Sequence, residues 1–150
     1  MPTEIWRRGI DIMLTGVFLG MKYQIPRLLA RGGGAIVNTS SGAGLIGVPM
    51  MSNYSAAKHA VIGLTRSAAL EYTQQGIRIN SVCPGTAKSG MVDEWLSGNP
   101  DGEAEVVALH PIGRIAEPEE IAAAVIWLCS EDSSFVMGSA LVIDGGYTVV

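Results

Sequence analysis

The segment GGGAIVNTSSG, residues 32–42, decides the fold class of this chain. Its three glycines are typical of the end of a helix, because glycine readily adopts the left-handed backbone conformation that terminates one. The apolar and β-branched residues 35–39 predict a short strand that is buried on both faces. Ser40, Ser41 and Gly42 end this strand in a polar turn. A buried strand between a helix and a turn is typical of the parallel sheets of α/β proteins.

Helical and strand-like segments alternate along the rest of the chain. Residues 4–30 have apolar positions at helical spacing and predict one long helix, with Pro26 as a potential kink. Residues 53–75 predict a second helix, and residues 77–83 predict a second strand.

The C-terminal third continues this pattern. Residues 86–100 contain two glycines and a proline without clear periodicity and predict a loop or a mobile flap. A short helix over 103–109 and a helix that starts in the acidic turn 117–120 and runs through residue 128 follow. Residues 140–143 predict the last strand. We therefore expect one domain over residues 1–150, an α/β fold with a doubly wound parallel sheet of about three strands.

The composition excludes several classes of protein. Hydrophobic residues make up 48% of the chain and charged residues only 16%, which excludes a disordered tail or a solvated linker. A net charge of -4 and the lack of a basic cluster larger than Arg7-Arg8 argue against nucleic acid as a partner. The apolar stretches fall short of the roughly 20 residues that cross a bilayer, and the first residues do not resemble a secretory signal. We expect a cytoplasmic protein with no membrane partner.

The cysteines and histidines show no metal-binding pattern. Cys83 and Cys129 lie in apolar sequence and are expected to be buried, reduced thiols. His59 and His110 have no second histidine or cysteine at ligand spacing. We predict no metal site.

Three residues are candidates for a catalytic site. Tyr54 and Lys58 are four residues apart in the predicted helix 53–75, so their side chains lie on one face, one turn apart. An ammonium beside a phenol favours the phenolate, which makes this pair a candidate general acid/base. Ser41 follows a buried strand, where α/β sheets bind ligands, and its hydroxyl can orient a carbonyl. Each signal alone has a simpler explanation, because such a Tyr and Lys pair occurs by chance in helices and a Ser-Ser-Gly cluster is often only a turn.

Together, these blocks follow the order of a known family. They are Asn38-Thr39-Ser40-Ser41, Gly44, Tyr54-Ser55-Ala56-Ala57-Lys58, Pro84-Gly85 and Asp144-Gly145-Gly146-Tyr147. The sequence resembles the short-chain dehydrogenase/reductase family over essentially its whole length. The resemblance implies a Rossmann-like sheet and hydride transfer between a nicotinamide cofactor, NAD or NADP, and a secondary alcohol or ketone.

The resemblance also implies roles for individual residues. The family tyrosine that matches Tyr54 exchanges a proton with the substrate oxygen, and the lysine that matches Lys58 activates this tyrosine and binds the nicotinamide ribose. The serine that matches Ser41 holds the substrate oxygen. The segment from Pro84 and Gly85 to Ala87 and Ser89 matches the part of the family that fixes the nicotinamide carboxamide, through the backbone of Ala87 and the hydroxyl of Ser89.

The sequence departs from the family in two places. Met13 stands where the family usually has an asparagine that helps to hold a water chain, and a thioether donates no hydrogen bond. Asn38 or a backbone carbonyl would have to hold this water instead. The family's opening strand and glycine-rich turn have no counterpart here, since the glycine run 32–34 precedes a strand. We therefore expect the C-terminal half to two thirds of a family member, N-terminally truncated and without the adenosine- and pyrophosphate-binding half.

These departures also support a second interpretation. The chain would then be a truncated, catalytically inactive relative that acts only as an association module or results from a shortened reading frame. Association is expected in either case, because the segment 121–128 is apolar on all sides, which indicates burial on more than one side. The resemblance implies a homo-oligomer, either a dimer or a tetramer.

The substrate pocket is expected in the variable segment 86–114. The apolar residues expected to line it are Met91, Val92, Trp95 and Leu96. The expected partner is a small-molecule alcohol or ketone.

Overall fold

The computed structural model describes residues 1–97, 99 and 102–149, and at Met91 and Trp95 it describes the backbone alone. Its helices and strands, in chain order, are α1 (Thr3–Ile10), α2 (Gly16–Ala30), β1 (Gly34–Thr39), α3 (Ser52–Tyr72), β2 (Ile77–Pro84), α4 (Gly90–Leu96), α5 (Gly102–Ala108), α6 (Pro118–Cys129) and β3 (Ala140–Ile143). All three predicted strands are present with nearly the predicted bounds.

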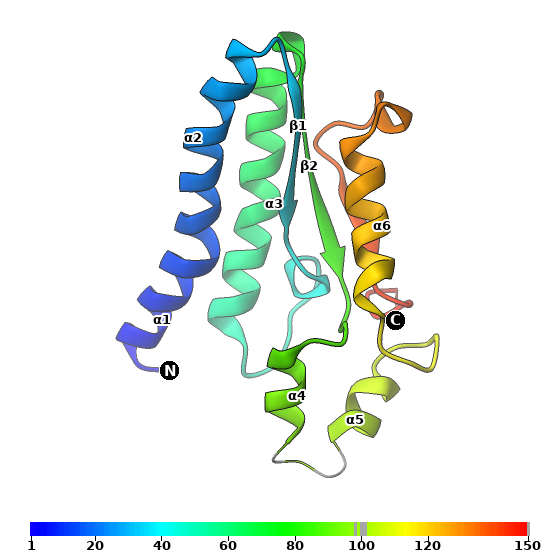
Figure 1. The fold of residues 1–150 in the computed structure, drawn as a ribbon. Helices are drawn as coiled ribbons and strands as arrows, with labels where there is room; N and C mark the ends of the chain where they lie inside the picture. The colour runs from blue at the N-terminus through cyan, green and yellow to red at the C-terminus, as the bar shows by residue number, and fades with distance from the viewer. Residues whose placement is uncertain (98, 100–101, 150) are drawn as a thin grey trace.

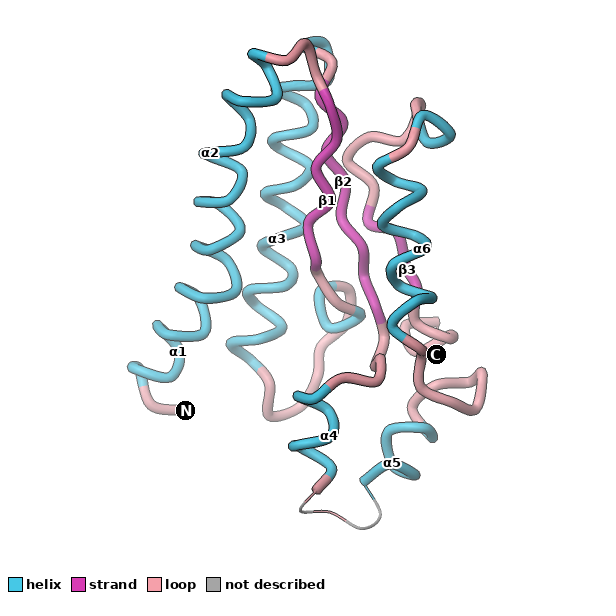
Figure 2. Tube along the Cα trace, viewed as in Figure 1, coloured by secondary structure: helices cyan, strands magenta, loops and turns pink. Residues whose placement is uncertain are grey.

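The three strands form one parallel sheet in the order β1-β2-β3. β1 pairs with β2 over its whole length, and β3 pairs with the last four residues of β2. Figure 2 shows the strands side by side with helices around them. The predicted α/β class with a doubly wound parallel sheet is therefore confirmed.

Helices cover both faces of this sheet. The helices α2 and α3 pack on one face, and α6 packs on the other (Figure 1). The central strand β2 is thus covered by both layers, and its Ile77, Ile79 and Val82 are fully buried. Complete burial of one such side chain contributes about 1.5–3 kcal/mol. The core between the sheet, α2 and α3 consists of Met21, Ile25, Ile36, Ala68, Ala69, Ile77 and Ile79.

The predicted helix 4–30 is continuous but changes its hydrogen-bonding pattern once. A π-helical segment, Asp11–Thr15, joins α1 to α2, and the Gly16 N–H donates to the Asp11 carbonyl. Pro26 lies inside α2, which continues beyond it to Ala30. The irregularity therefore lies at Asp11–Thr15 and not at the proline.

Two glycine turns meet at the start of β1 and β2. Gly33 and Gly76 both have a positive φ, of 130° and 79°, and the Gly34 N–H donates to the Gly76 carbonyl at 3.0 Å. A Cβ on Gly33 would lie 2.4 Å from the Gly76 oxygen, so only glycine fits there. The glycine run thus ends α2, as predicted, at the edge of the sheet opposite the predicted site.

The prediction of a loop over 86–100 is wrong for its middle part. The helix α4 begins after Ser89, whose Oγ accepts a hydrogen bond from the Val92 N–H at 3.3 Å. A serine cap and an acidic first turn stabilise a short helix that apolar periodicity does not reveal. Residues 98 and 100 of the predicted loop lie outside the described residues, as do the side chains of Met91 and Trp95 in the predicted apolar pocket.

The helix α6 buries one face within the chain and exposes apolar side chains on the other. Only Leu128 is buried in this helix, while Ile126 is 68% exposed and Trp127 is 40% exposed. Cys129, predicted to be a buried thiol, is free and exposed, whereas Cys83 is buried as predicted. The cause is that one face of α6 packs on the sheet, and its other face has no element of the described chain over it.

Candidate functional site

The candidate site lies at the carboxyl ends of β1 and β2, the edge where parallel sheets bind their ligands. Ser41 follows β1, and the first turns of α3 carry Tyr54 and Lys58. The remaining predicted residues end β2 or follow it: Pro84, Gly85, Ala87 and Ser89. In Figure 1 the lower ends of β1, β2 and α3 and the start of α4 lie at this same end of the molecule.

Lys58 is anchored to the backbone of β1 and lies beside the Tyr54 ring. Its Nζ donates a hydrogen bond to the Thr39 carbonyl at 2.9 Å and lies 5.6 Å from the ring centroid of Tyr54. Burial lowers the pKa of Lys58, because it penalises the ammonium form, and the electrostatic interaction with Cys83 opposes this shift more weakly. The site therefore holds a partly desolvated ammonium next to a phenol.

The turn after β1 packs tightly on α3. The buried Ser40 donates from Oγ to the Lys58 carbonyl at 2.9 Å. A Cβ on Gly44 would lie 2.4 Å from that Oγ and 2.9 Å from the Lys58 oxygen, so glycine is needed for this approach. These contacts fix the turn that carries Ser41 against the helical turn that carries Lys58.

The hydroxyls of Ser41 and Ser89 have a common arrangement. Each begins a helical segment, and its Oγ accepts a hydrogen bond from a backbone N–H, that of Ala43 at 3.2 Å and that of Val92 at 3.3 Å. Because a hydroxyl has one hydrogen to donate, these backbone contacts leave the O–H of both serines available for a ligand.

The loop after β2 is held from two sides. The Gly85 N–H donates to the Ile143 carbonyl of β3 at 2.9 Å. Farther along, Ala87 forms a parallel bridge with Ala116, and the Lys88 N–H donates to the Ala116 carbonyl at 2.9 Å. The backbone around Ala87 is therefore ordered by the segment that precedes α6.

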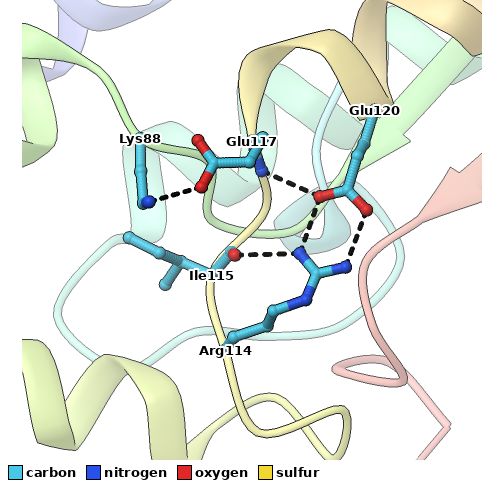
Figure 3. Close-up of polar contacts among 5 residues, drawn as sticks. All are labelled: Lys88, Arg114, Ile115, Glu117 and Glu120. Atoms are coloured by element: carbon cyan, nitrogen blue, oxygen red, sulfur yellow. Dashed lines mark hydrogen bonds and ion pairs between the residues drawn. The ribbon is translucent and has the colours of Figure 1, made fainter.

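Two ion pairs at the start of α6 reinforce this contact (Figure 3). Lys88 pairs with Glu117, and Arg114 forms a bidentate pair with Glu120 at 2.7 Å. Glu120 also accepts from the Glu117 N–H at 2.9 Å, and these contacts, led by the hydrogen bond from Arg114, lower its pKa to about 2. Sequence reasoning identified the acidic turn as a helix start but missed both cations. Lys88 is 29 residues from its partner Glu117, and Arg114, six residues from Glu120, lies outside the predicted helix.

The residues considered for the water chain differ in their surroundings. Met13 lies in the π-helical segment and lines a cavity of about 720 Å³ that Lys58 also lines. The Asn38 side chain is buried, and its amide donates to Met21 Sδ at 3.0 Å and to Thr65 Oγ1 at 2.9 Å. Because both amide hydrogens are engaged in the core, Asn38 has no donor left for a water beside Lys58.

Metal-binding clusters and membrane-spanning helices are both absent from the described residues. Among residues 1–97, 99 and 102–149, no group of three or more His, Cys, Asp or Glu side chains is arranged to hold a metal ion. Within the same described part, no helix has the length and apolar character needed to cross a membrane.

Comparisons with known proteins identify the relatives of this chain. The family model described as enoyl-(acyl carrier protein) reductase, a short-chain dehydrogenase/reductase model, matches residues 1–148. Cyclohexanol dehydrogenase of Acinetobacter sp. (strain SE19) is 57% identical over 99% of this chain, and 2,5-dichloro-2,5-cyclohexadiene-1,4-diol dehydrogenase of Sphingobium indicum is 48% identical over 98%. The solved structure of ElxO with NADP bound matches all of this chain with a TM-score of 0.94 and 35% identity.

These relatives are longer than this chain. The chain spans 57% of the cyclohexanol dehydrogenase, 59% of the diol dehydrogenase and 60% of the ElxO chain. The match of the family model over nearly every residue, together with a parallel sheet of the expected order, shows that the chain belongs to the short-chain dehydrogenase/reductase family.

Proposed function

We propose that this chain carries the proton-transfer part of an NAD(P)-dependent oxidoreductase that interconverts a secondary alcohol and a ketone. Tyr54 is the general acid/base, Lys58 its electrostatic activator and Ser41 the hydroxyl that orients the substrate oxygen. The observation that carries the proposal is the anchored ammonium of Lys58, 2.9 Å from the Thr39 carbonyl and 5.6 Å from the Tyr54 ring.

The donor groups at the site fit the nicotinamide end of the cofactor. The Lys58 ammonium and the hydroxyls of Tyr54 and Ser89 are hydrogen-bond partners of the kind that ribose hydroxyls and a carboxamide require. The backbone from Pro84 and Gly85 to Ala87 lies at the carboxyl end of β2, where it can approach the carboxamide. The bound cofactor would supply or accept the hydride.

The chain's own residues would accept the proton of the alcohol and stabilise the charge on its oxygen. When an alcohol is oxidised, its O–H proton must leave as negative charge develops on the oxygen. The Tyr54 oxygen is the proposed acceptor of this proton, and the Lys58 ammonium beside the ring stabilises the negative charge that develops during the transfer. The Ser41 oxygen accepts a hydrogen bond from the Ala43 N–H, so its own hydrogen can be donated to the substrate oxygen.

The names of the relatives support a proposal for the substrate class. The two curated relatives described above are named for the oxidation of a cyclic alcohol and a cyclic diol. We infer a cyclic secondary alcohol as the first substrate to test, with cyclohexanol as the probe. NAD and NADP should both be tried, because ElxO was solved with NADP bound.

A substitution at Tyr54 tests the proposed role. Tyr54→Phe removes the hydroxyl but keeps the ring, and we expect it to lower the rate of cyclohexanol oxidation by about 10²- to 10⁴-fold, the usual contribution of a positioned acid/base. Tyr23→Phe is the matched control, because Tyr23 also lies near a lysine, 5.7 Å from Lys22 Nζ, but is 60% exposed on α2. Full activity in Tyr54→Phe would contradict the proposed role.

Cofactor binding separates the enzyme from an inactive association module. If the chain is active by itself, calorimetric titration of its 150 residues with NADH and NADPH gives a dissociation constant below about 100 µM, or some 5 to 6 kcal/mol. If a folded chain does not bind either cofactor, the second interpretation is favoured. Ser41, Tyr54 and Lys58 would then be retained in a chain that has lost catalytic activity.

We also propose that the chain forms a homo-oligomer through the exposed apolar surface of α6 and β3. The exposed large apolar side chains on these two elements are Ile126, Trp127 and Val142. Sedimentation equilibrium of the wild type and of Ile126→Glu tests the proposal, since a charge on this face should shift the mass towards the monomer.

A further inference from the structure

His110, which the sequence did not connect with the site, touches the loop after β2. It is only 4% exposed and follows α5. Its Nδ1 lies 2.8 Å from the Val106 carbonyl oxygen, and its Nε2 accepts a hydrogen bond from the Thr86 N–H at 3.0 Å. A Cβ on Gly85 would lie 2.8 Å from this Nε2, so the ring is packed directly against the loop.

These two partners determine the protonation state of the ring. Val106 offers an acceptor and Thr86 offers a donor, so one ring nitrogen must donate and the other must accept. Only the neutral imidazole with its hydrogen on Nδ1 satisfies both. A second proton would sit on Nε2 and point at the Thr86 N–H, which would break the contact with the loop.

Other titratable groups also face this ring. Asp144 and Tyr147, from the segment after β3, lie beside it, and the Tyr147 ring is stacked on it with centroids 5.4 Å apart. Burial alone would raise the pKa of Asp144, but hydrogen bonds from Thr148 and Gly146 outweigh this effect and lower it. Arg114 and Glu120, which pair with each other, line the same cavity of about 310 Å³ as His110.

The stacked tyrosine links the ring to the other half of the site. A Cβ on Gly42 would lie 2.8 Å from the Tyr147 ring, so Tyr147 packs against the turn that begins with Ser41. One side chain therefore contacts His110 on one side and the turn after β1 on the other.

We propose that His110 is a positioning residue that holds the loop after β2 in its ligand-binding arrangement, and that it does so only as the neutral imidazole. The proposal rests on the function proposed above, since this loop is the one assigned to the nicotinamide carboxamide. A second proton on the ring would release the Thr86 N–H and loosen the backbone from Gly85 to Ala87.

His59 provides a matched control within the same chain. It is the only other histidine, and its Nδ1 also lies close to a carbonyl four residues earlier, that of Ser55 at 2.9 Å. His59 is exposed on α3 and, among the described contacts, has no backbone N–H at Nε2. Both histidines thus have Nδ1 close to a carbonyl four residues earlier, but only His110 accepts a backbone hydrogen bond at Nε2 among the described contacts.

The first test needs no cofactor and no variant. Nitrogen NMR of the wild-type chain should find His110 with its hydrogen on Nδ1, and the Thr86 amide resonance should shift when acid protonates this ring. A hydrogen on Nε2, or a Thr86 amide that does not respond to this protonation, would overturn the proposal.

The second test measures NADH affinity against pH for three variants. His110→Gln keeps an acceptor that does not titrate, so its affinity should stay constant where that of the wild type falls. His110→Leu removes the acceptor and should bind NADH about threefold to tenfold more weakly at every pH, as expected for one lost backbone hydrogen bond. His59→Gln should keep the wild-type profile.

Failure of the positioning role and failure of the proposed function give different results. An affinity in His110→Leu equal to that of the wild type at every pH would overturn the positioning role even if NADH binds. If neither the wild type nor any variant binds NADH, the proposed function fails, while the NMR titration still decides whether His110 holds the loop.

Discussion

The turn after β1 and the loop after β2 end at the same edge of the sheet, but different interactions hold them. The turn is fixed by close backbone packing, in which Ser40 is 2% exposed and Gly44 is buried against the Lys58 carbonyl. The loop depends on His110 and on the Lys88–Glu117 pair, whose side chains are 55% and 50% exposed. Packing is insensitive to pH and salt, whereas exposed pairs and an imidazole respond to both.

The two kinds of support correspond to two proposed roles, proton transfer and contact with the cofactor. The proton-transfer groups proposed here depend on the rigid turn, and the groups proposed to meet the cofactor depend on the adjustable loop. We therefore expect substitutions in the turn to affect stability most, and substitutions around the loop to affect mainly the dependence on pH and salt.

The largest effect is expected for Gly44→Ala. The added methyl would lie 2.4 Å from Ser40 Oγ and 2.9 Å from the Lys58 oxygen, and we expect a loss of about 1–3 kcal/mol of unfolding free energy in urea titrations. Gly47→Ala is the control, because a Cβ there meets nothing within 4 Å. Equal stabilities of the two variants would show that the turn is not rigid.

A smaller effect is expected for Ser40→Ala. This substitution removes one buried hydrogen bond to the Lys58 carbonyl and should lower the unfolding free energy by about 1 kcal/mol. Ser97→Ala is the comparison, since Ser97 Oγ makes a similar bond to the Glu94 carbonyl in an exposed position. If both variants lose the same amount, burial does not distinguish the turn from the surface.

The smallest effect is expected at Glu120, and it should depend on pH. Its folded-state pKa of about 2 lies below the ordinary value of 4.5, so the carboxylate contributes stability above about pH 4.5 that is lost as the pH falls through about 2. The difference in unfolding free energy between the wild type and Glu120→Gln should therefore shrink with acidification. Glu119→Gln, an exposed neighbour in the same first turn, should show a much weaker trend.

Local patterns predicted the framework of the fold. The β-branched runs at 35–39 and 77–83 and the glycines that precede them determine the strands, because burial and turn geometry act on neighbouring residues. The helix α4 escaped prediction, because its stability comes from the Ser89 cap and not from an apolar stripe. The exposure of Cys129 could not be predicted, because periodicity does not show which faces of an apolar helix find a partner.

The candidate site was predictable only in part. Tyr54, Lys58 and Ser41 carry a recognisable spacing, and the sheet topology brings their elements to one edge. The contacts that hold the loop join residues far apart in sequence, such as Thr86 with His110 and Lys88 with Glu117. No local pattern marks such pairs, so only the folded chain reveals them.

The π-helical segment Asp11–Thr15 determines how the packing face of α1 is rotated relative to the packing face of α2. A π turn accommodates about one extra residue, which rotates the positions before it by about 100° relative to a continuous α-helix. The rotation suits the neighbours, since α1 packs against α3 whereas α2 packs against β1. Deleting a single residue between Asp11 and Thr15 would restore α-helical spacing and turn the packing face of α1 away from α3. Insertions and deletions in this segment should therefore destabilise the fold far more than those in a surface loop.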